Sequence, residues 1–151
     1  MLKNKTKRQL VLTVMAAIAF APTAAQAYDF TPEGSANWIG IARNLTLAID
    51  SGNERTRACD GINAFAAMRA DFRREVTTTK SWAVFAHGQV CLGLAMDANH
   101  NGAKCKAYKK AISELAKAQA STDPADVVAA ATMLKDSLSS MVVDLEEAKL
   151  C

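Results

Sequence analysis

The sequence predicts an all-α protein, a single disulfide-linked bundle of about five helices that folds after an N-terminal signal peptide is removed. Apolar residues recur at helical spacing in five stretches, and no stretch shows the sustained alternation typical of strands. Half of the 151 residues are hydrophobic and 22% are charged, a balance that excludes a disordered polyelectrolyte. Four cysteines form an even set, as expected for a disulfide framework in an exported chain.

The first 27 residues have the pattern of a secretory signal peptide. A basic stretch at 1–8 precedes an apolar run at 10–20, and small residues follow in the Ala-Gln-Ala motif at 25–27. The apolar run is shorter than the roughly 20 residues that a membrane anchor needs. We therefore expect cleavage after Ala27, a single mature domain at 28–151, no stable membrane anchor, and a periplasmic or secreted location.

Removal of the signal peptide changes the charge of the protein. The full chain has 18 Lys and Arg against 15 Asp and Glu, a net charge of +3. Four basic residues and no acidic ones lie in 1–27, which leaves 14 basic against 15 acidic residues, or −1. Nucleic-acid binding relies on clustered Lys and Arg and is not expected. The remaining basic cluster, expected to be a solvated helix face, is Lys104, Lys106, Lys109 and Lys110.

The expected helices begin and end at recognisable signals. They span about 31–52, 55–76, 81–96, 103–120 and 122–149. The first begins at Thr31 and Pro32, an N-cap followed by a proline, and ends near Gly52. The last has an N-cap candidate in Thr122 or Asp123.

The third helix, 81–96, is expected at the centre of the bundle. It contains no charged residue, and its strongly polar side chains are His87 and Gln89. A helix that is apolar all round is buried. Gly88 and Gly93 would each cost about 1 kcal/mol relative to alanine inside a helix, which indicates close approach of a neighbouring helix. The methionines expected to fill the core are Met68, Met96, Met133 and Met141.

The cysteines are expected to form structural disulfides, because no Cys-x-x-Cys motif, zinc-ligand spacing or haem attachment site accompanies them. They are Cys59, Cys91, Cys105 and Cys151, and three pairings are open. If the last four helices run up and down in sequence at 1.5 Å per residue, Cys91 and Cys105 lie at similar heights of roughly 17 and 21 Å. We therefore expect Cys91 to pair with Cys105, and Cys59 to pair with Cys151 after the C-terminus bends back.

Two further features invite a functional interpretation. His87 has the chemistry of a general base, a haem ligand or a pH sensor, but a hydrogen-bonded core histidine is the expectation, since no catalytic motif accompanies it. The segment 97–102 begins like a calcium loop, yet Tyr108 stands where the bidentate glutamate belongs. We expect a helix-to-helix turn at 97–102 and no metal, cofactor or enzymatic activity.

The second helix, 55–76, is rich in arginine. Arginine is enriched at protein interfaces because its guanidinium group pairs with carboxylates through two hydrogen bonds. The candidates for a binding face are Arg69, Arg73 and Arg74, together with His87. The alternative is a solvated face in which the arginines alternate with acidic residues.

In general layout the chain is similar to small periplasmic immunity proteins and inhibitors, which are often exported, helical and disulfide-linked. This resemblance implies a non-enzymatic protein that binds another protein, whose identity the sequence does not give. One alternative is a small-ligand-binding or catalytic bundle centred on His87. Another is a structural or envelope-stress protein, and homo-oligomerisation is compatible with all three.

Overall fold

The described part of the chain is built from four α-helices and two short 3₁₀-helices. The computed structural model describes residues 30–52, 56–60 and 81–151. The elements are α3 (Pro32–Ser51), η1 (Arg57–Cys59), α6 (Ser81–Ala95), η2 (Ala98–His100), α7 (Asn101–Gln119) and α8 (Ala125–Glu147). These residues contain no strand, so the predicted all-α class is confirmed. The predicted signal peptide, 1–27, lies outside the described residues.

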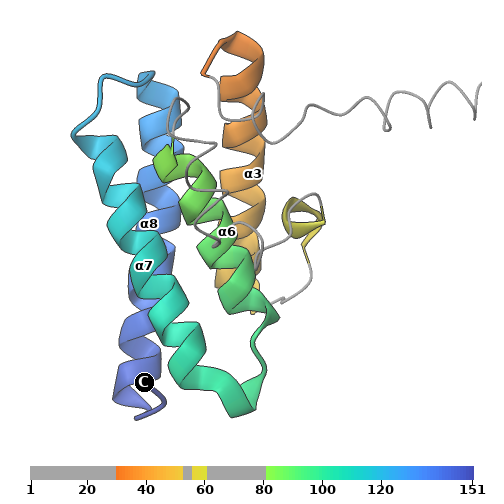
Figure 1. The fold of residues 1–151 in the computed structure, drawn as a ribbon, viewed down its shortest axis with the longest axis vertical. Helices are drawn as coiled ribbons and strands as arrows, with labels where there is room; N and C mark the ends of the chain where they lie inside the picture. Colours follow the sequence, from red (N-terminus) through yellow and green to blue (C-terminus); the bar gives the residue numbers. More distant parts are fainter. Residues whose placement is uncertain (1–29, 53–55, 61–80) are drawn as a thin grey trace, which may run out of the picture.

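The α-helices lie side by side in a bundle (Figure 1). α6 packs along α7, α7 along α8 and α8 along α3, whereas α3 and α6 meet over a shorter stretch. α6, α7 and α8 alternate in direction because short connections make consecutive helices antiparallel, and α3 runs in the same direction as α8. None of the helices in these ranges combines the length and apolarity needed to cross a bilayer.

Local sequence explains where α3 begins and ends. The Thr31 hydroxyl accepts a hydrogen bond of 3.2 Å from the backbone N–H of Gly34, and Pro32 occupies the first helical position. At the other end, Gly52 adopts the left-handed conformation with φ 67°, which glycine reaches without steric cost. Both predicted ends of this helix are confirmed.

The start of α8 differs from the prediction. Pro124 directly precedes the helix, and no side chain caps it, so the predicted cap by Thr122 or Asp123 is wrong. The carboxylate of Asp123 instead accepts a hydrogen bond of 3.1 Å from the indole Nε1–H of Trp82. This contact joins the turn before α8 to the beginning of α6.

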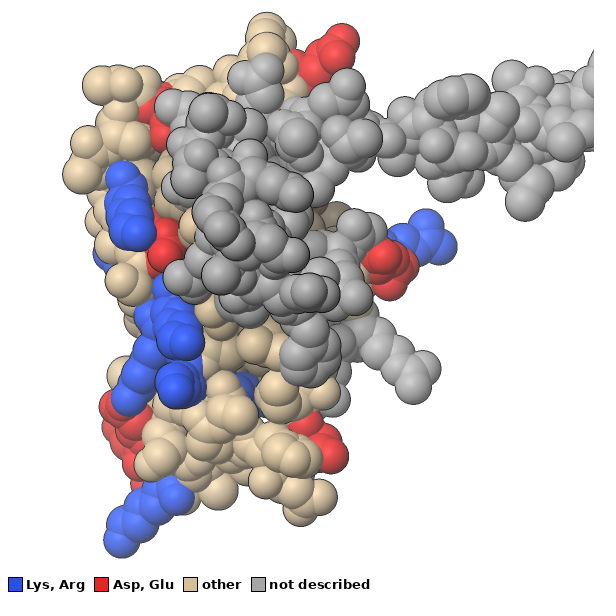
Figure 2. Space-filling model, viewed as in Figure 1, with Lys and Arg blue, Asp and Glu red and all other residues tan. Residues whose placement is uncertain are grey.

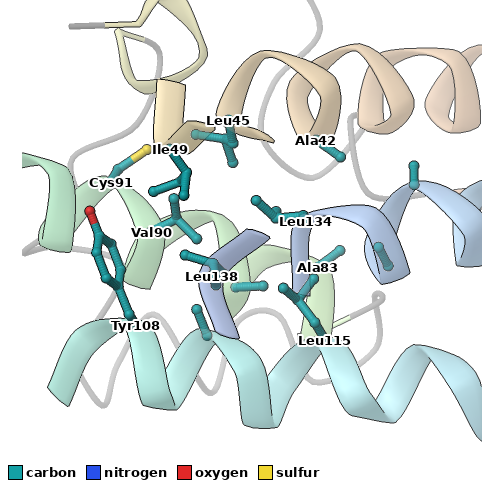
Figure 3. Packing of buried hydrophobic residues seen from close by; sticks show 14 of the residues in the cluster. Ala42, Leu45, Ile49, Ala83, Val90, Cys91, Tyr108, Leu115, Leu134 and Leu138 are labelled. Carbon is teal, nitrogen blue, oxygen red and sulfur yellow. The ribbon is translucent and has the colours of Figure 1, made fainter. Parts of the chain in front are cut away.

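The core lies between the helices and consists mainly of leucine, valine and alanine side chains. Figure 3 shows Leu134 and Leu138 of α8 between Leu45 of α3 on one side and Leu115 of α7 on the other. All four leucines are 0% exposed. Each contributes about 1.5–3 kcal/mol relative to an exposed side chain, so α8 connects the packing of α3 to that of α7.

α6 is buried on all sides, as the absence of charge in its sequence predicted. Between residues 82 and 94 every side chain is buried or partly buried. Gly93 faces α7, and a Cβ added there would lie 2.6 Å from Cδ1 of Tyr108 and closer still to Cε1. The predicted close approach of a neighbouring helix is therefore confirmed at Gly93.

The predicted helix 55–76 is wrong at its beginning. Thr56 is extended, and its hydroxyl accepts a hydrogen bond of 3.2 Å from the N–H of Ala58. This local hydrogen bond competes with α-helical geometry, and residues 57–59 form the 3₁₀-helix η1. The rest of the predicted helix, with Arg69, Arg73 and Arg74, lies outside the described residues.

Two disulfides link parts of the chain that are distant in sequence. Cys59 is bonded to Cys91 with a Cα–Cα distance of 5.6 Å, and Cys105 to Cys151 with 5.7 Å. The prediction that all four cysteines form disulfides is confirmed. The predicted pairs, Cys91 with Cys105 and Cys59 with Cys151, are wrong.

The direction in which each cysteine points explains the correction. Gly93 faces Tyr108 of α7, and Cys91 lies two residues earlier, about 200° around the helix axis at 100° per residue. Its sulfur therefore points away from α7, which lies at the bottom of Figure 3. The predicted pairing matched heights along the helices but left out rotation about their axes.

The C-terminal segment, residues 148–151, reverses direction after α8. The N–H of Lys149 donates to the carbonyl of Glu146 (3.0 Å), and that of Leu150 donates to the carbonyl of Leu145 (2.8 Å). These two bonds form a Schellman motif, whose left-handed position is usually a glycine. Lys149 occupies it with φ 58°, and the reversal brings Cys151 to Cys105.

Replacing Lys149 by glycine is expected to raise the free energy of unfolding by about 1 kcal/mol, because a left-handed residue with a Cβ costs roughly 1–2 kcal/mol. Urea denaturation of the oxidised protein measures the change. The matched control is Lys110→Gly on the exposed face of α7, which is expected to lower stability by about 1 kcal/mol. A loss of stability in both variants would contradict the strain at Lys149.

Candidate functional site

His87 lies in the core and holds η1 against α6. Its side chain is 4% exposed, and its Nε2 lies 2.5 Å from the carbonyl oxygen of Ala58. Cys91, one turn later on the same side of α6, is bonded to Cys59, the residue after Ala58. A hydrogen bond and a disulfide thus attach η1 to one face of α6. This is the hydrogen-bonded core histidine that the sequence predicted.

Burial also sets the protonation of His87. Removal of the imidazole from water lowers its pKa below the ordinary value of 6.5, because desolvation disfavours the charged form, and the hydrogen bond to Ala58 offsets part of this effect. The buried ring is therefore neutral near pH 7. A neutral, enclosed imidazole that is hydrogen-bonded to a carbonyl is suited to positioning η1.

This pKa predicts a loss of stability in acid. The unfolded chain binds more protons than the folded protein between the folded pKa of His87 and about 6.5. Stability is therefore complete above about pH 6.5 and falls as the pH drops towards the folded pKa. We expect urea midpoints to fall from pH 7.5 to pH 5 in the parent, and to fall less in His87→Gln. Equal slopes in the parent and in His87→Gln would contradict this assignment.

The segment resembling a calcium loop forms a turn between helices. The Asp97 carboxylate accepts a hydrogen bond from the N–H of Asn99 (2.9 Å) and lies 2.6 Å from Nδ1 of His100. The bonds to His100 and to Asn99 lower the pKa of Asp97, and its Oδ1 caps η2 through the bond from Asn99. Among the described residues, no three His, Cys, Asp or Glu side chains are placed to hold a metal ion.

The lysines of α7 form a band on the surface, visible over that helix in Figure 2. Lys106, Lys110 and Lys117 lie on one side of the helix, at intervals of four and seven residues. Lys117 pairs with Glu114 at 3.0 Å, and Lys109 pairs with Glu146 of α8 at 2.8 Å. Exposed ion pairs of this kind stabilise a protein little. Of the four lysines predicted to form a solvated face, Lys106, Lys109 and Lys110 are exposed and Lys104 is partly buried.

A less polar surface runs along the outside of α8. Six exposed positions follow one another at intervals of four and three and therefore share one face, which we term the outer stripe. They are Ala129, Met133, Asp136, Ser140, Val143 and Glu147. Met133 is 54% and Val143 49% exposed. The prediction that Met133 fills the core is wrong, because the buried side of α8 is occupied by Val127, Leu134 and Leu138.

The structure separates the residues that the sequence singled out. His87 lies in the core beside η1, the cysteines form two separate crosslinks, and the three candidate arginines are outside the described residues. Sequence reasoning did not identify the outer stripe. The alternating intervals of three and four residues between Met133 and Val143 were a signal that could have revealed it. It was obscured because the buried stripe of the same helix has the same spacing.

Comparison with known protein families, with curated proteins and with solved structures found no match. The bundle defines a class, a disulfide-linked helical domain, and leaves the function to be inferred from its surface and its buried groups.

Proposed function

We propose that the mature protein is an exported, non-enzymatic helical protein that acts by binding another protein, such as an inhibitor or immunity protein that neutralises an effector or enzyme. The signal-peptide pattern and the two disulfides support export, because disulfides persist in oxidising compartments. The outer stripe of α8 carries the proposal of protein binding.

The outer stripe has the spacing and composition of a helix-packing surface. Intervals of four and three residues let a second helix lie along the first. Ala129 and Ser140 are small and permit close approach, while Met133 and Val143 supply exposed apolar area that a partner would remove from water. Asp136 is the one charge between Ala129 and Val143 on this stripe. The partner we infer is a protein that presents an apolar helix face.

The alternative centred on His87 gains no support from this geometry. A ligand or substrate would have to reach a side chain that is 4% exposed and whose Nε2 is engaged by the carbonyl of Ala58. A structural or envelope-stress role would also involve contact with other proteins, so the identity of the partner distinguishes it from inhibition.

Site-specific photo-crosslinking in the producing cell tests the proposal. A photoreactive phenylalanine derivative is introduced at Met133 or at Val143, and in a control protein at Ser113, an exposed position of α7. We expect Met133 and Val143 to give an adduct of the same mass that Ser113 does not give. Identification of the adduct by mass spectrometry then names the partner.

A second variant separates specific binding from chance collision. Val143→Asp places a charge on the stripe at an exposed position, so the fold is expected to be retained. It should abolish the adduct formed from Met133, whereas Ser113→Asp should leave that adduct unchanged. Adducts of equal yield from all three positions, or no adduct from either stripe position, would contradict protein binding through α8.

A further inference from the structure

We propose that the Cys105–Cys151 disulfide is a thiol-exchange site, at which an external thiol attacks Cys151, and that the Cys59–Cys91 disulfide is the purely structural bond. This inference is independent of the proposed protein-binding function. It rests on differences between the surroundings of the two disulfides.

The two ends of the Cys105–Cys151 bond differ in accessibility. Cys105 is 3% exposed and belongs to the core cluster, whereas Cys151 is an exposed residue in the segment that follows α8. Thiol–disulfide exchange depends on access to the sulfur that is attacked. In the proposed exchange, the incoming thiolate approaches from the exposed Cys151 side and attacks its Sγ, and Cys105 is the leaving group.

The segment that carries Cys151 can separate without disturbing the helices. Residues 148–151 are all exposed, including Leu150 at 45%. Besides the disulfide, this segment is held by the backbone hydrogen bonds that end α8. The end of α8 itself is attached to α7 by the ion pair between Glu146 and Lys109, and by the leucine packing further along. The left-handed conformation of Lys149 adds strain that opening relieves.

The Cys59–Cys91 bond lacks these features. Cys91 is 4% exposed, and Cys59 is partly buried against the core. The hydrogen bond between His87 and Ala58 holds the residue next to Cys59 in place. A thiolate that attacks this bond would first have to displace η1 from α6, so exchange requires a larger opening of the fold.

The exchange step is balanced without an oxidant. The thiolate of an external thiol forms a bond to the Sγ of Cys151 while the Cys105–Cys151 bond breaks. The electron pair of the broken bond leaves on the Sγ of Cys105, which then takes up a proton from water. The products are a mixed disulfide at Cys151 and a free thiol at Cys105, and the reverse attack by Cys105 restores the starting bond.

Exchange with reduced glutathione, followed by acid quenching and peptide mass mapping, tests the proposal on the whole mature protein. We expect glutathione at Cys151 and a free Cys105, formed at least about ten times faster than any adduct at Cys59 or Cys91. Circular dichroism at 222 nm should change little during the reaction. Adducts at Cys59 or Cys91 that form as fast, or exchange that begins only when helical signal is lost, would overturn the assignment.

Two variants test the proposal by a route that does not depend on mapping adducts in the parental protein. In Cys105→Ala/Cys151→Ala, glutathione incorporation should fall at least about tenfold while helical signal is retained. Lys149→Gly removes the strain of the left-handed residue in the disulfide-bonded form, so the equilibrium yield of the Cys151 adduct should fall about fivefold. Lys110→Gly should leave this yield unchanged. Undiminished incorporation in a double variant that keeps its helical signal would refute the proposal. If that variant loses helical signal, the mapping of glutathione adducts on the parental protein decides the outcome.

Discussion

Replacing Cys59 and Cys91 together by alanine is expected to lower the free energy of unfolding by about 3–4 kcal/mol. The bond joins residues that are 32 positions apart, and the chain-entropy treatment of a loop of this size gives roughly this value. Part of the cost arises because η1 then depends on the hydrogen bond between His87 and Ala58 for its attachment to α6. Urea denaturation of the oxidised parent and the double variant measures the difference.

The single variant Cys59→Ala tests the pairing on which this prediction depends. With the pairing found in the structure, Cys91 becomes the free thiol and Cys105 stays bonded to Cys151. Alkylation under denaturing conditions should therefore label Cys91 alone. Labelling of Cys151 would instead support the Cys59–Cys151 pairing that was expected from helix heights, and it would contradict the prediction.

Replacing Gly93 by alanine is expected to lower the free energy of unfolding by about 2 kcal/mol. The new methyl group would overlap the ring of Tyr108, which is 2% exposed and enclosed by the core. Overpacking of this kind costs about 1–3 kcal/mol, which outweighs the gain of about 1 kcal/mol from the helix propensity of alanine when α6 and α7 cannot separate. Thermal or urea denaturation gives the value.

Gly40 supplies the matched control for Gly93. It lies inside α3 on an exposed face, and a Cβ added there meets no atom within 4 Å. Gly40→Ala is therefore expected to raise stability by about 1 kcal/mol through helix propensity. In addition, Tyr108→Leu should be less destabilising in the Gly93→Ala background than in the parent, because it removes the overlapping ring. Stabilisation by both alanine substitutions would show that the two helices are not in close contact.

The helices were predictable because their signals are local. Thr31, Pro32 and Gly52 act through backbone groups within a few residues, so the sequence contains the whole cause of the helix ends. The central position of α6 was predictable for a similar reason, since a helix without charged residues has no face to expose to water. Asp123 shows the limit of this reasoning, because Trp82 lies 41 positions away and competes for its carboxylate.

The disulfide pairing and the outer stripe depend on the arrangement of the helices in space. The choice between pairs for Cys91 depends on which side of α6 faces α7, and the spacing of residues along one helix does not define that side. Met133 and Leu134 are adjacent and both apolar, yet one is 54% exposed and the other 0%. α8 carries two interleaved stripes, and which of them becomes buried depends on where its neighbouring helices, α3 and α7, pack against it.

The bond between Cys105 and Cys151 also determines how the protein responds to proteolysis. It joins positions 46 residues apart and so closes the α7–α8 pair into a covalent ring. A single cut in the turn between the two helices, at residues 120–124, leaves both pieces connected through the sulfurs and packed against the same core. Both fragments would separate on a gel only after reduction, so a nicked molecule can retain its fold in an environment that contains proteases.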